Sequence, residues 1–387
     1  MLLRKRILHL LEHGETRSKL AKIAGVTNSN IGRFIEGGNL DFYAATKIVR
    51  DYWPEEEQDL MTDFSRNMKR NAKIAMEYAF VTRNRELQKE LIQTFKKSKG
   101  RLEREWAKIY NIEFLRTIEQ IKPGEIIEKL ENKFFETLEM KIYSNILLSY
   151  AYYDINEFTQ SLNKLLSIEY KVADISNELI RRCYTSRMGQ VLSSIYFYKD
   201  NEKMSKKYYY LVLEHAIDEV SLASTYHSLG FIYFYSDLEL ALSNLERSRA
   251  MYICGGSPKK TQQVENTINF VQIYHGIKPS YLKVSDDFKD LHNLAFYYIR
   301  MGQSTKAKQL LEQINMDELS NYYKAFHYYY LGELTLDDTY YYDSIIEFIE
   351  AGNDFFLRLP IEGLRKNGAS EKLLQVLIYR RKGKRLK

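Results

Sequence analysis

Proline and glycine are scarce in this chain, with five prolines and eighteen glycines among 387 residues. Long loops and the many tight turns of a β-sandwich are therefore not expected. Leucine, isoleucine, lysine, glutamate and 32 tyrosines recur instead at helical spacing. The composition predicts an all-α protein, large enough for several helical layers, in which most tyrosines serve packing.

Cysteine is also rare, and long apolar runs are lacking. Cys183 and Cys254 are far apart and form no metal-ligand or redox motif, which favours two free thiols in a reducing compartment. The N-terminal MLLRKRILHLLEHGE is interrupted by charges within a few residues, too soon for a signal sequence or a membrane span. We therefore expect a cytoplasmic protein without a membrane partner.

The sequence contains none of the common motifs of enzyme active sites. It has no P-loop or dinucleotide-binding glycine pattern, no HExxH, no CxxC and no GxSxG. Its seven histidines show no ligand spacing. We predict that the chain is not an enzyme and that it has no catalytic residues, no metal and no cofactor.

The most informative motif present is LAKIAGVTNSNIGRF, residues 20–34, whose spacing fits a helix-turn-helix. Gly25 supplies the turn, Ser18 is a plausible cap of the first helix, and Thr27 or Asn28 can cap the second. The residues expected to form the small core are Leu20, Ala21, Ala24, Val26 and Ile31. The outward residues predicted to contact double-stranded DNA are Arg17, Lys19, Thr27, Asn28, Ser29, Asn30 and Arg33.

Positive charge is concentrated in the same segment. From Arg4 to Arg50 the chain has nine lysines and arginines against four acids, a local net charge of +5 out of +6 for the whole chain. A locally positive surface favours DNA through counterion release. The alternative is a small helical bundle that contacts no DNA or serves dimerisation.

We divide the chain into four segments. Residues 1–70 form the helix-turn-helix domain, with a helix break at Trp53 and Pro54, and residues 71–122 a charged helical connector. Residues 123–370 show a degenerate repeat resembling tetratricopeptide repeats: an aromatic-rich helix, a turn, then a helix with a small residue near its start. These small residues are Ser161, Ser205, Ala241, Ala307 and Ser344, with spacings of 44, 36, 66 and 37. The longest spacing leaves room for a diverged unit around Val264 to Leu282.

Residues 371–387 are predicted to form a short helix followed by a basic tail. Leu373, Leu374, Leu377 and Ile378 can cap the end of an α-solenoid or meet their copies in a second subunit, and capping is the expected single role. The tail is expected to be a frayed, solubilising end, with contact to DNA phosphates as the alternative.

The whole chain resembles the arbitrium receptors (AimR) of temperate phages of bacilli, within the peptide-sensing regulators that include Rap, PlcR and NprR. The segment that resembles the family most specifically is KAFHYYYLGELTLDDTYYYDSIIEFIEAGNDFFLRLP, near the C-terminus. WPEEEQDLMTDF and NAKIAMEYAF, nearer the N-terminus, also look like the family's sequence.

The resemblance implies a homodimer in the cytoplasm of the host bacterial cell that binds an operator with inverted repeats. A short secreted peptide, imported by the host, would bind the repeats, end DNA binding and shift the phage from lysis to lysogeny. One alternative is a chromosomal quorum-sensing regulator of the same architecture. Another is a Rap-like protein that binds a response regulator, although the helix-turn-helix motif argues against it.

The resemblance also implies the peptide-binding residues, which map to Ser194, Tyr198, His292, Asn293, Asn353 and Phe355. Phe355 matches as an apolar wall. In the family, acids stand at the positions of Asn293 and Asn353, poised for an arginine of the peptide. The amides here lose that charge-assisted pairing, so the cognate peptide differs or another acid, such as Asp354, substitutes. Ordinary packing between repeats is the alternative role for each of these residues.

Overall fold

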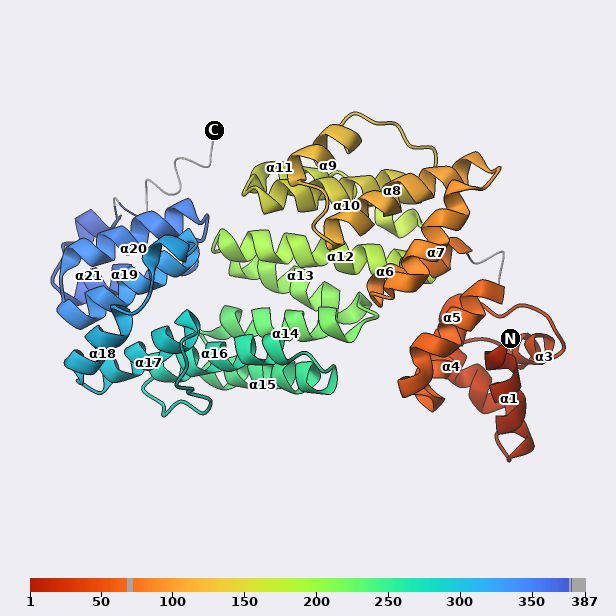
Figure 1. Cartoon of the computed structure of the whole chain (residues 1–387), viewed down its shortest axis with the longest axis horizontal. Helices are drawn as coiled ribbons and strands as arrows, with labels where there is room; N and C mark the ends of the chain where they lie inside the picture. Colours follow the sequence, from red (N-terminus) through yellow and green to blue (C-terminus); the bar gives the residue numbers. More distant parts are fainter. Residues whose placement is uncertain (68–71, 376, 378–387) are drawn as a thin grey trace. The chain divides into compact units, whose positions relative to one another are not determined.

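The computed structural model describes residues 1–67, 72–375 and 377, and every regular element in these ranges is a helix (Figure 1). The all-α prediction is confirmed. Residues 1–188 with 215–218 form one compact unit, here called unit 1, and residues 189–214 with 219–387 form unit 2. The division falls inside one helix, so it differs from the four predicted segments, which stay a prediction.

Unit 1 begins with a small helical head whose core is aromatic. Phe42 packs edge-on against Phe64 and Tyr78, and Phe34 contacts Phe64 in the same way. The break predicted at Trp53 and Pro54 is present, because a 3-10 turn separates two helices there. The head's elements are α1 (Leu2–Glu12), α2 (Arg17–Ala24), α3 (Asn28–Ile35), α4 (Phe42–Tyr52), η1 (Pro54–Glu56) and α5 (Glu57–Asn67).

The rest of unit 1 contains the predicted connector and the first helices of the repeats. The connector is helical throughout most of its length, as α6 (Ala72–Val81), α7 (Arg85–Lys96) and α8 (Arg101–Thr117). The elements that follow are α9 (Pro123–Leu130), α10 (Leu138–Asp154), α11 (Phe158–Leu166), η3 (Lys171–Asp174) and the first half of α12 (Glu178–Tyr198).

A buried cluster of charged and tyrosine side chains joins α6, α8 and α12 within unit 1. The carboxylate of Glu77, which is fully buried, accepts hydrogen bonds from Arg187 Nε at 3.0 Å and from the Tyr110 hydroxyl at 2.7 Å. Arg187 also lies 3.5 Å from Glu113, which Arg116 holds from the other side at 2.8 Å. Burial raises the pKa of Glu77, against the opposing effect of Arg187. We call Glu77, Tyr110, Glu113, Arg116 and Arg187 the charged cluster.

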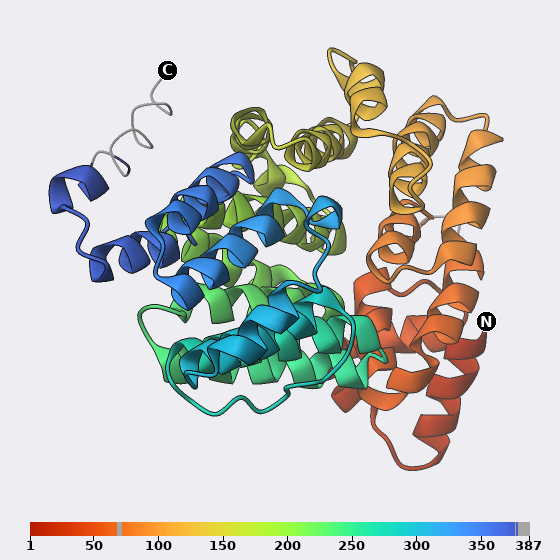
Figure 2. The same cartoon turned by 60° about the vertical axis from the view of Figure 1, so that its left-hand side comes forward.

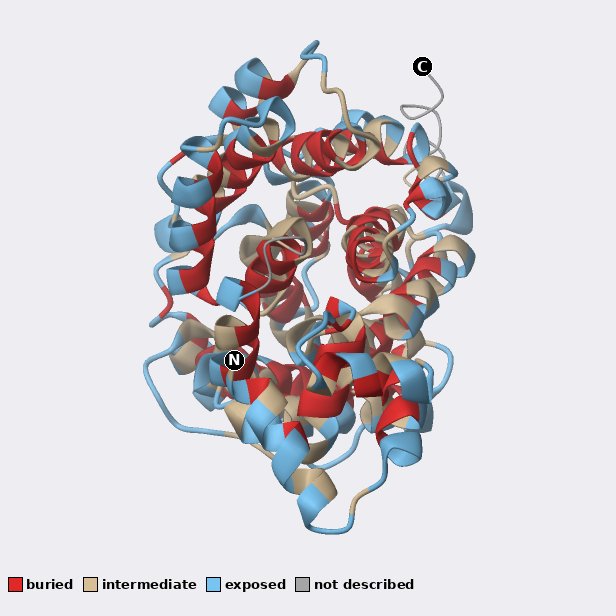
Figure 3. Ribbon diagram, turned by 90° about the vertical axis from the view of Figure 1, so that its right-hand side faces the viewer, coloured by how far each residue is buried: buried red, intermediate tan, exposed pale blue. Residues whose placement is uncertain are grey.

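Unit 2 consists of helix pairs in which the two helices run in opposite directions and lie side by side (Figures 1 and 2). Individual helices carry buried residues along one side and exposed residues along the other (Figure 3). Beside the second half of α12, its first elements are α13 (Glu202–His215), α14 (Glu219–Tyr233), α15 (Leu238–Cys254) and α16 (Pro258–Tyr274). The later ones are α17 (Phe288–Arg300), α18 (Ser304–Leu311), η4 (Met316–Glu318), α19 (Asn321–Thr335), α20 (Asp338–Glu350) and α21 (Arg358–Lys366).

The small residues identified in the repeat lie buried between the two helices of each pair. All five are fully buried, on α11, α13, α15, α18 and α20. The three serines also donate hydrogen bonds to a carbonyl oxygen of the preceding helix, Ser161 to Ser149, Ser205 to Ser193 and Ser344 to Ala325, at 2.8 to 2.9 Å. The predicted helix-pair repeat is therefore confirmed, and a larger side chain at these positions would push the pair apart.

The prediction of a diverged repeat unit, with two helices, around Val264 to Leu282 is wrong. A single helix, α16, occupies this region, and an irregular segment leads from it to α17. Side chains of α16 satisfy the backbone of that segment: Asn269 accepts from the N–H of Tyr281 at 2.9 Å, and Gln272 from that of Ser280 at 2.8 Å. These bonds replace those that a second helix would make internally.

At the C-terminal end, Leu374 is fully buried in the core of unit 2, and Leu377 packs against that core. Both positions agree with the predicted capping role. Leu373 is 42% exposed, and Ile378 lies outside the described residues. Their role in dimerisation stays a prediction. Among the described residues, no helix combines the length and apolar character that a membrane crossing would need.

Candidate functional site

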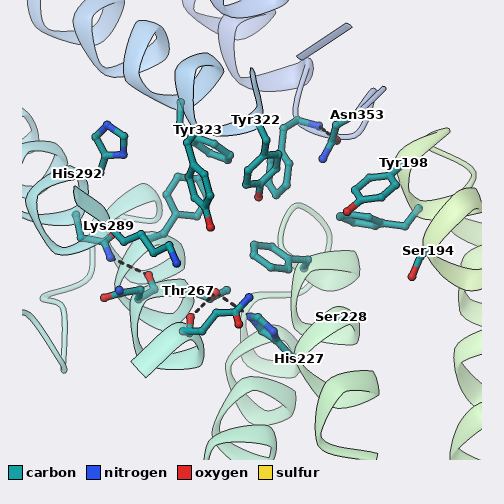
Figure 4. A pocket seen from close by; sticks show the side chains of 18 of the residues that line it. Ser194, Tyr198, His227, Ser228, Thr267, Lys289, His292, Tyr322, Tyr323 and Asn353 are labelled. Atoms are coloured by element: carbon teal, nitrogen blue, oxygen red, sulfur yellow. Dashed lines mark hydrogen bonds between the residues drawn. The ribbon is translucent and has the colours of Figure 1, made fainter. Parts of the chain in front are cut away.

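A cavity of about 450 Å³ lies entirely within unit 2. This volume falls within the range of roughly 300 to 1,000 Å³ that is common for ligand pockets. Its walls come mainly from one face each of α12, α14, α16, α17 and α19, the first helices of successive pairs and the unpaired α16. Figure 4 shows Tyr322 and Tyr323 directed into it from α19, with Tyr198 on the side of α12.

The lining follows helical periodicity. On α14 it consists of Ser224, His227, Ser228 and Phe231, and on α16 of Gln263, Asn266, Thr267 and Phe270. Both sets have the spacing i, i+3, i+4, i+7, which places their members on one face of a helix. Each face is polar at its start and aromatic at its end, so the cavity is polar on one side and aromatic on the other.

Five of the six residues predicted to contact a peptide line this cavity: Ser194, Tyr198, His292, Asn293 and Asn353. Phe355 does not. Its ring packs behind the wall, 4.4 Å from the ring of Phe197 and 5.1 Å from that of Tyr235. Phe356 faces the cavity in its place, with Phe326 at 5.1 Å and Phe231 at 5.5 Å.

The position of Phe355 outside the cavity lining has a local cause. The two phenylalanines follow a turn after α20, where no helical or strand period indicates which ring points inward. The backbone N–H of Asp354 donates to the carbonyl of Tyr198 at 2.8 Å, which holds the turn against α12. Asp354, the alternative acid, is only 2% exposed and is not among the residues that line the cavity.

The hydrogen bonds of the polar wall determine the state of His227. Thr267 Oγ1 donates to the carbonyl of Gln263 at 3.1 Å and lies 2.8 Å from His227 Nε2. The Thr267 hydroxyl and Nε2 thus form one hydrogen bond, in which either group can be the donor. Burial, assisted by the nearby Lys260, lowers the pKa of His227 to about 4. His227 is therefore neutral at physiological pH.

His292, the predicted contact on α17, is also neutral. Its Nε2 lies 3.1 Å from Nδ1 of His327, so one of the two rings donates to the other. Burial and the neighbouring His327 lower the pKa of His292, and burial lowers that of His327 to about 4. His292 contributes aromatic surface to the cavity wall but no charge, and His327 supports it from behind the wall.

Two amide groups of the wall have a donor without a partner. Asn353 is 1% exposed, and its Oδ1 accepts from the backbone N–H of Phe356 at 3.3 Å. A backbone N–H can only donate, so the other end of the amide is Nδ2, which has no partner among the described residues. Nδ2 of Asn266 is in the same state, whereas Nδ2 of Asn293 donates to the carbonyl of Asn266 at 3.1 Å. The wall thus offers unused donors.

The helix-turn-helix is formed as predicted. Gly25 adopts a left-handed conformation with φ of 70° between α2 and α3, and Leu20, Ala21, Ala24 and Ile31 are buried. Val26 is only half-buried. Thr27 caps α3, but the cap of α2 is Thr16, which accepts from the N–H of Lys19, and not Ser18. The β-region backbone required at an N-cap falls at Thr16, one turn before the apolar face begins.

The predicted DNA-contacting residues fall into two groups. Arg17, Asn28, Ser29 and Arg33 are exposed. The other three make side-chain contacts within the head, although Lys19 and Thr27 are also exposed. Asn30 completes the capping box with Thr27, and Lys19 pairs with Glu15 at 2.8 Å. Hydrogen bonds from Lys19, Tyr52 and the Thr16 N–H lower the pKa of Glu15 to about 2.

Sequence reasoning missed most of α16 and Lys289, although the pattern that reveals them was present. TQQVENTINF places Gln263, Asn266 and Thr267 on one face, and a polar face on a helix inside a solenoid indicates a lined cavity. Lys289 precedes His292 by three residues on α17, so it shares the face of a predicted contact that lines the cavity.

Comparison with known proteins places this architecture in a family. A family model described as AimR transcriptional regulator-like matches residues 57–366, well over half of the chain. The chain belongs to this AimR-like family. Its members are transcription regulators and not enzymes, as the sequence predicted. The match begins after the helix-turn-helix and covers the whole cavity.

Individual AimR relatives extend the likeness to most of the chain. The AimR transcriptional regulator of Bacillus phage phi3T is 25% identical over 376 residues, covering 93% of this chain and 96% of the relative. That of Bacillus phage SPbeta is 25% identical over 370 residues, covering 93% and 95%. Among solved structures, selenomethionine phAimR superposes with a TM-score of 0.85 at 22% identity, over 97% of this chain and 99% of that one. A phAimR structure with its ligand gives a TM-score of 0.67 at 22% identity, over 83% and 96%.

Proposed function

We propose that this chain is a peptide-responsive transcription regulator that controls the lysis–lysogeny decision of a phage. A homodimer binds an operator with inverted repeats through the helix-turn-helix, and a short signalling peptide in the cavity ends that binding. Family membership supports the regulatory role, and a related protein, phAimR, has a structure with a ligand. The observation that carries the proposal is the cavity itself, because its unpartnered donors are suited to the carbonyl and carboxylate groups of a peptide.

Contacts between the head and later helices offer a route for the signal within unit 1. Arg50 on α4 holds Glu57 with a bidentate pair at 2.8 to 3.0 Å and donates to the carbonyl of Ile217 at 2.5 Å. Ile217 lies in the turn that leads into α14, whose face carries His227 and Ser228. A peptide that moves α14 would therefore disturb the contact between Arg50 of α4 and Ile217. Because α4 packs on α2, this would change the orientation of the helix-turn-helix.

The proposal is tested with the full chain and a labelled DNA duplex from the region upstream of its own gene. Fluorescence anisotropy measures binding against random DNA at several salt concentrations. Synthetic peptides from the C-terminal end of the short reading frame beside the gene are then titrated in. We expect selective binding that the peptide abolishes. Binding no stronger than to random DNA, or binding that no peptide changes, would refute the proposal.

Arg33→Ala tests the DNA-contacting surface. Arg33 is exposed on α3, so its loss should weaken operator binding by about 1 to 3 kcal/mol if it contacts a base, and leave peptide affinity unchanged. Arg66→Ala is the matched control, because Arg66 is an exposed arginine of the same unit that pairs with Glu90. Equal loss in both variants would show that only general charge matters and that α3 is not the recognition helix.

Arg50→Lys tests the route. A lysine retains the charge opposite Glu57 but lacks the fork that reaches Glu57 and Ile217 together. We expect operator and peptide affinities within about twofold of the unaltered chain, and a peptide effect on operator affinity reduced at least fivefold. Arg66→Lys, at an exposed bidentate pair of the same unit, is the control. An undiminished peptide effect would exclude this contact from the signal path.

A further inference from the structure

The cavity wall carries one charge, and it is positive. Among the described residues that line it, Lys289 is the single lysine or arginine, and no aspartate or glutamate is present. The two lining histidines are neutral, since burial lowers both of their pKa values. A ligand in this cavity therefore meets a cation and a set of neutral dipoles.

Lys289 is held at the wall by aromatic rings. Its Nζ lies 5.5 Å from the centre of the Tyr323 ring and 5.4 Å from that of Phe288, and Figure 4 shows its side chain reaching into the cavity. Cation–π contacts orient an ammonium group without neutralising it. Because no ion pair of Lys289 occurs within the described part of the chain, its charge is available to a ligand.

The neighbouring charges reinforce this picture. Lys260, which lies close enough to His227 to lower its pKa, adds positive potential beside Gln263, to which its Nζ donates at 3.4 Å. The acid next to Lys289 in the chain is Asp290, which is 2% exposed. Its Oδ2 accepts from Gln262 at 3.2 Å and from Ser285 at 2.6 Å, and it does not line the cavity.

Like the ammonium group of Lys289, the unpartnered side-chain NH₂ groups at the wall are hydrogen-bond donors. Nδ2 of Asn353 and Nδ2 of Asn266 are both buried donors at the wall. A buried donor without an acceptor destabilises the free protein, and a ligand oxygen would remove that cost. A cationic ligand group would bring further donors to a wall that already has too many, and it would lose its hydration without gaining a carboxylate.

We infer, resting on the proposed peptide-receptor function, that the cavity selects peptides that place a carboxylate against Lys289 and rejects peptides with a cationic side chain there. The carboxylate is either the peptide's C-terminus or an aspartate or glutamate side chain. Lys289 is thus a specificity-determining residue of the receptor, and Asn266 and Asn353 are further donors to the bound peptide.

The experiment uses pools of short synthetic peptides built from neutral residues and tested against the full chain by thermal unfolding, followed by calorimetry of the active members. One pool is neutral with a free C-terminus, one neutral and C-terminally amidated, one amidated with a single aspartate or glutamate, and one amidated with a single arginine or lysine. We expect stabilisation by the neutral free pool, by the acidic amidated pool, or by both. The amidated neutral pool and the cationic pool should not stabilise. Which of the first two acts identifies the source of the carboxylate.

Lys289→Met should weaken binding of the active peptides at least tenfold. Lys306→Met is the matched control, because Lys306 also lies over a tyrosine, with Nζ 5.2 Å from the centre of the Tyr298 ring, but outside the cavity lining. Binding should be unchanged there. Stabilisation by the cationic pool equal to that of the others, or unchanged binding by Lys289→Met, overturns the inference and leaves the receptor function standing. If no pool binds, the proposed function fails as well.

Discussion

The charged cluster of unit 1 and the cavity of unit 2 both place polar side chains in the interior, but they use them in opposite ways. In the cluster, each carboxylate oxygen of Glu77 has a partner, one on Arg187 and one on Tyr110. In the cavity, the donors of Asn353 and Asn266 have none, and the tyrosine rings of α19 border open space. Interior polarity alone therefore does not identify a site. Unpartnered polarity beside open space does.

The physical reason is the cost of desolvation. A charge removed from water is tolerated where its partners compensate, so a paired interior cluster contributes to one defined structure. A donor left without a partner destabilises the free protein, and that cost is recovered when a ligand binds. The following three predictions test this difference, in order of the expected effect.

The largest effect is expected in the cluster. Glu77→Ala leaves the buried Arg187 without its closest partner and should lower the free energy of unfolding by about 3 to 5 kcal/mol. Urea denaturation followed by the fluorescence of Trp106, whose ring stacks 5.5 Å from that of Tyr110, measures it. Glu90→Ala is the control, since its pair with Arg66 is exposed and is worth about 0 to 1 kcal/mol. If both variants lowered the free energy of unfolding by similar amounts, the buried cluster would contribute no more to stability than an exposed ion pair.

A matched pair of tyrosine substitutions compares the two regions directly. Tyr110→Phe removes a hydrogen bond to the carboxylate of Glu77 and should cost about 1.5 to 3 kcal/mol. Tyr322→Phe removes a cavity hydroxyl that has no hydrogen bond among the described residues, so the free energy of unfolding should change by less than about 0.5 kcal/mol. Peptide affinity should show the reverse order. If Tyr322→Phe destabilised the chain as much, the cavity's polar groups would be structural.

The smallest effect at neutral pH is the contribution of His227 protonation, which grows as the pH is lowered. His227 takes up a proton near pH 4 when folded and near 6.5 when unfolded, so between these values the unfolded state binds more protons. Stability should therefore fall as the pH is lowered from about 6.5 to about 4. His227→Gln should make this decline shallower by up to one proton. An identical decline in the two proteins would contradict the buried, neutral state of His227.

Several features could be predicted because a local rule determines them. Gly25 and Thr27 specify a turn and a cap by their own backbone and side-chain preferences, and the structure places them there. Ser161, Ser205 and Ser344 marked helix pairs because only small residues fit where two helices are closest. The resemblance located five cavity residues, since Ser194, Tyr198, His292 and Asn293 lie on helices whose faces periodicity defines.

Other features depend on which neighbour an element meets. No local rule distinguishes Phe355 from Phe356 after the turn that follows α20, because the choice depends on how that turn docks on α12. The lone helix α16 was misread as part of a pair because its partner is an irregular segment held by its own asparagine and glutamine side chains. Lys289 shares a helix face with His292. That no acidic side chain lines the cavity beside Lys289 becomes evident only when the five helices that form the walls are brought together.

The amino-acid sequence by itself determined the helical class, the turn and cap of the helix-turn-helix and the positions of the tight helix pairs, because each follows from steric and hydrogen-bonding preferences of nearby residues. The tertiary structure alone decided which polar side chains found partners. Glu77 and Arg187 are 110 positions apart and neutralise each other, whereas Lys289 and Asn353 meet no such partner. Electrostatic compensation acts through space between residues distant in the chain, so only the folded arrangement separates an interior charge that supports the fold from one available to a ligand.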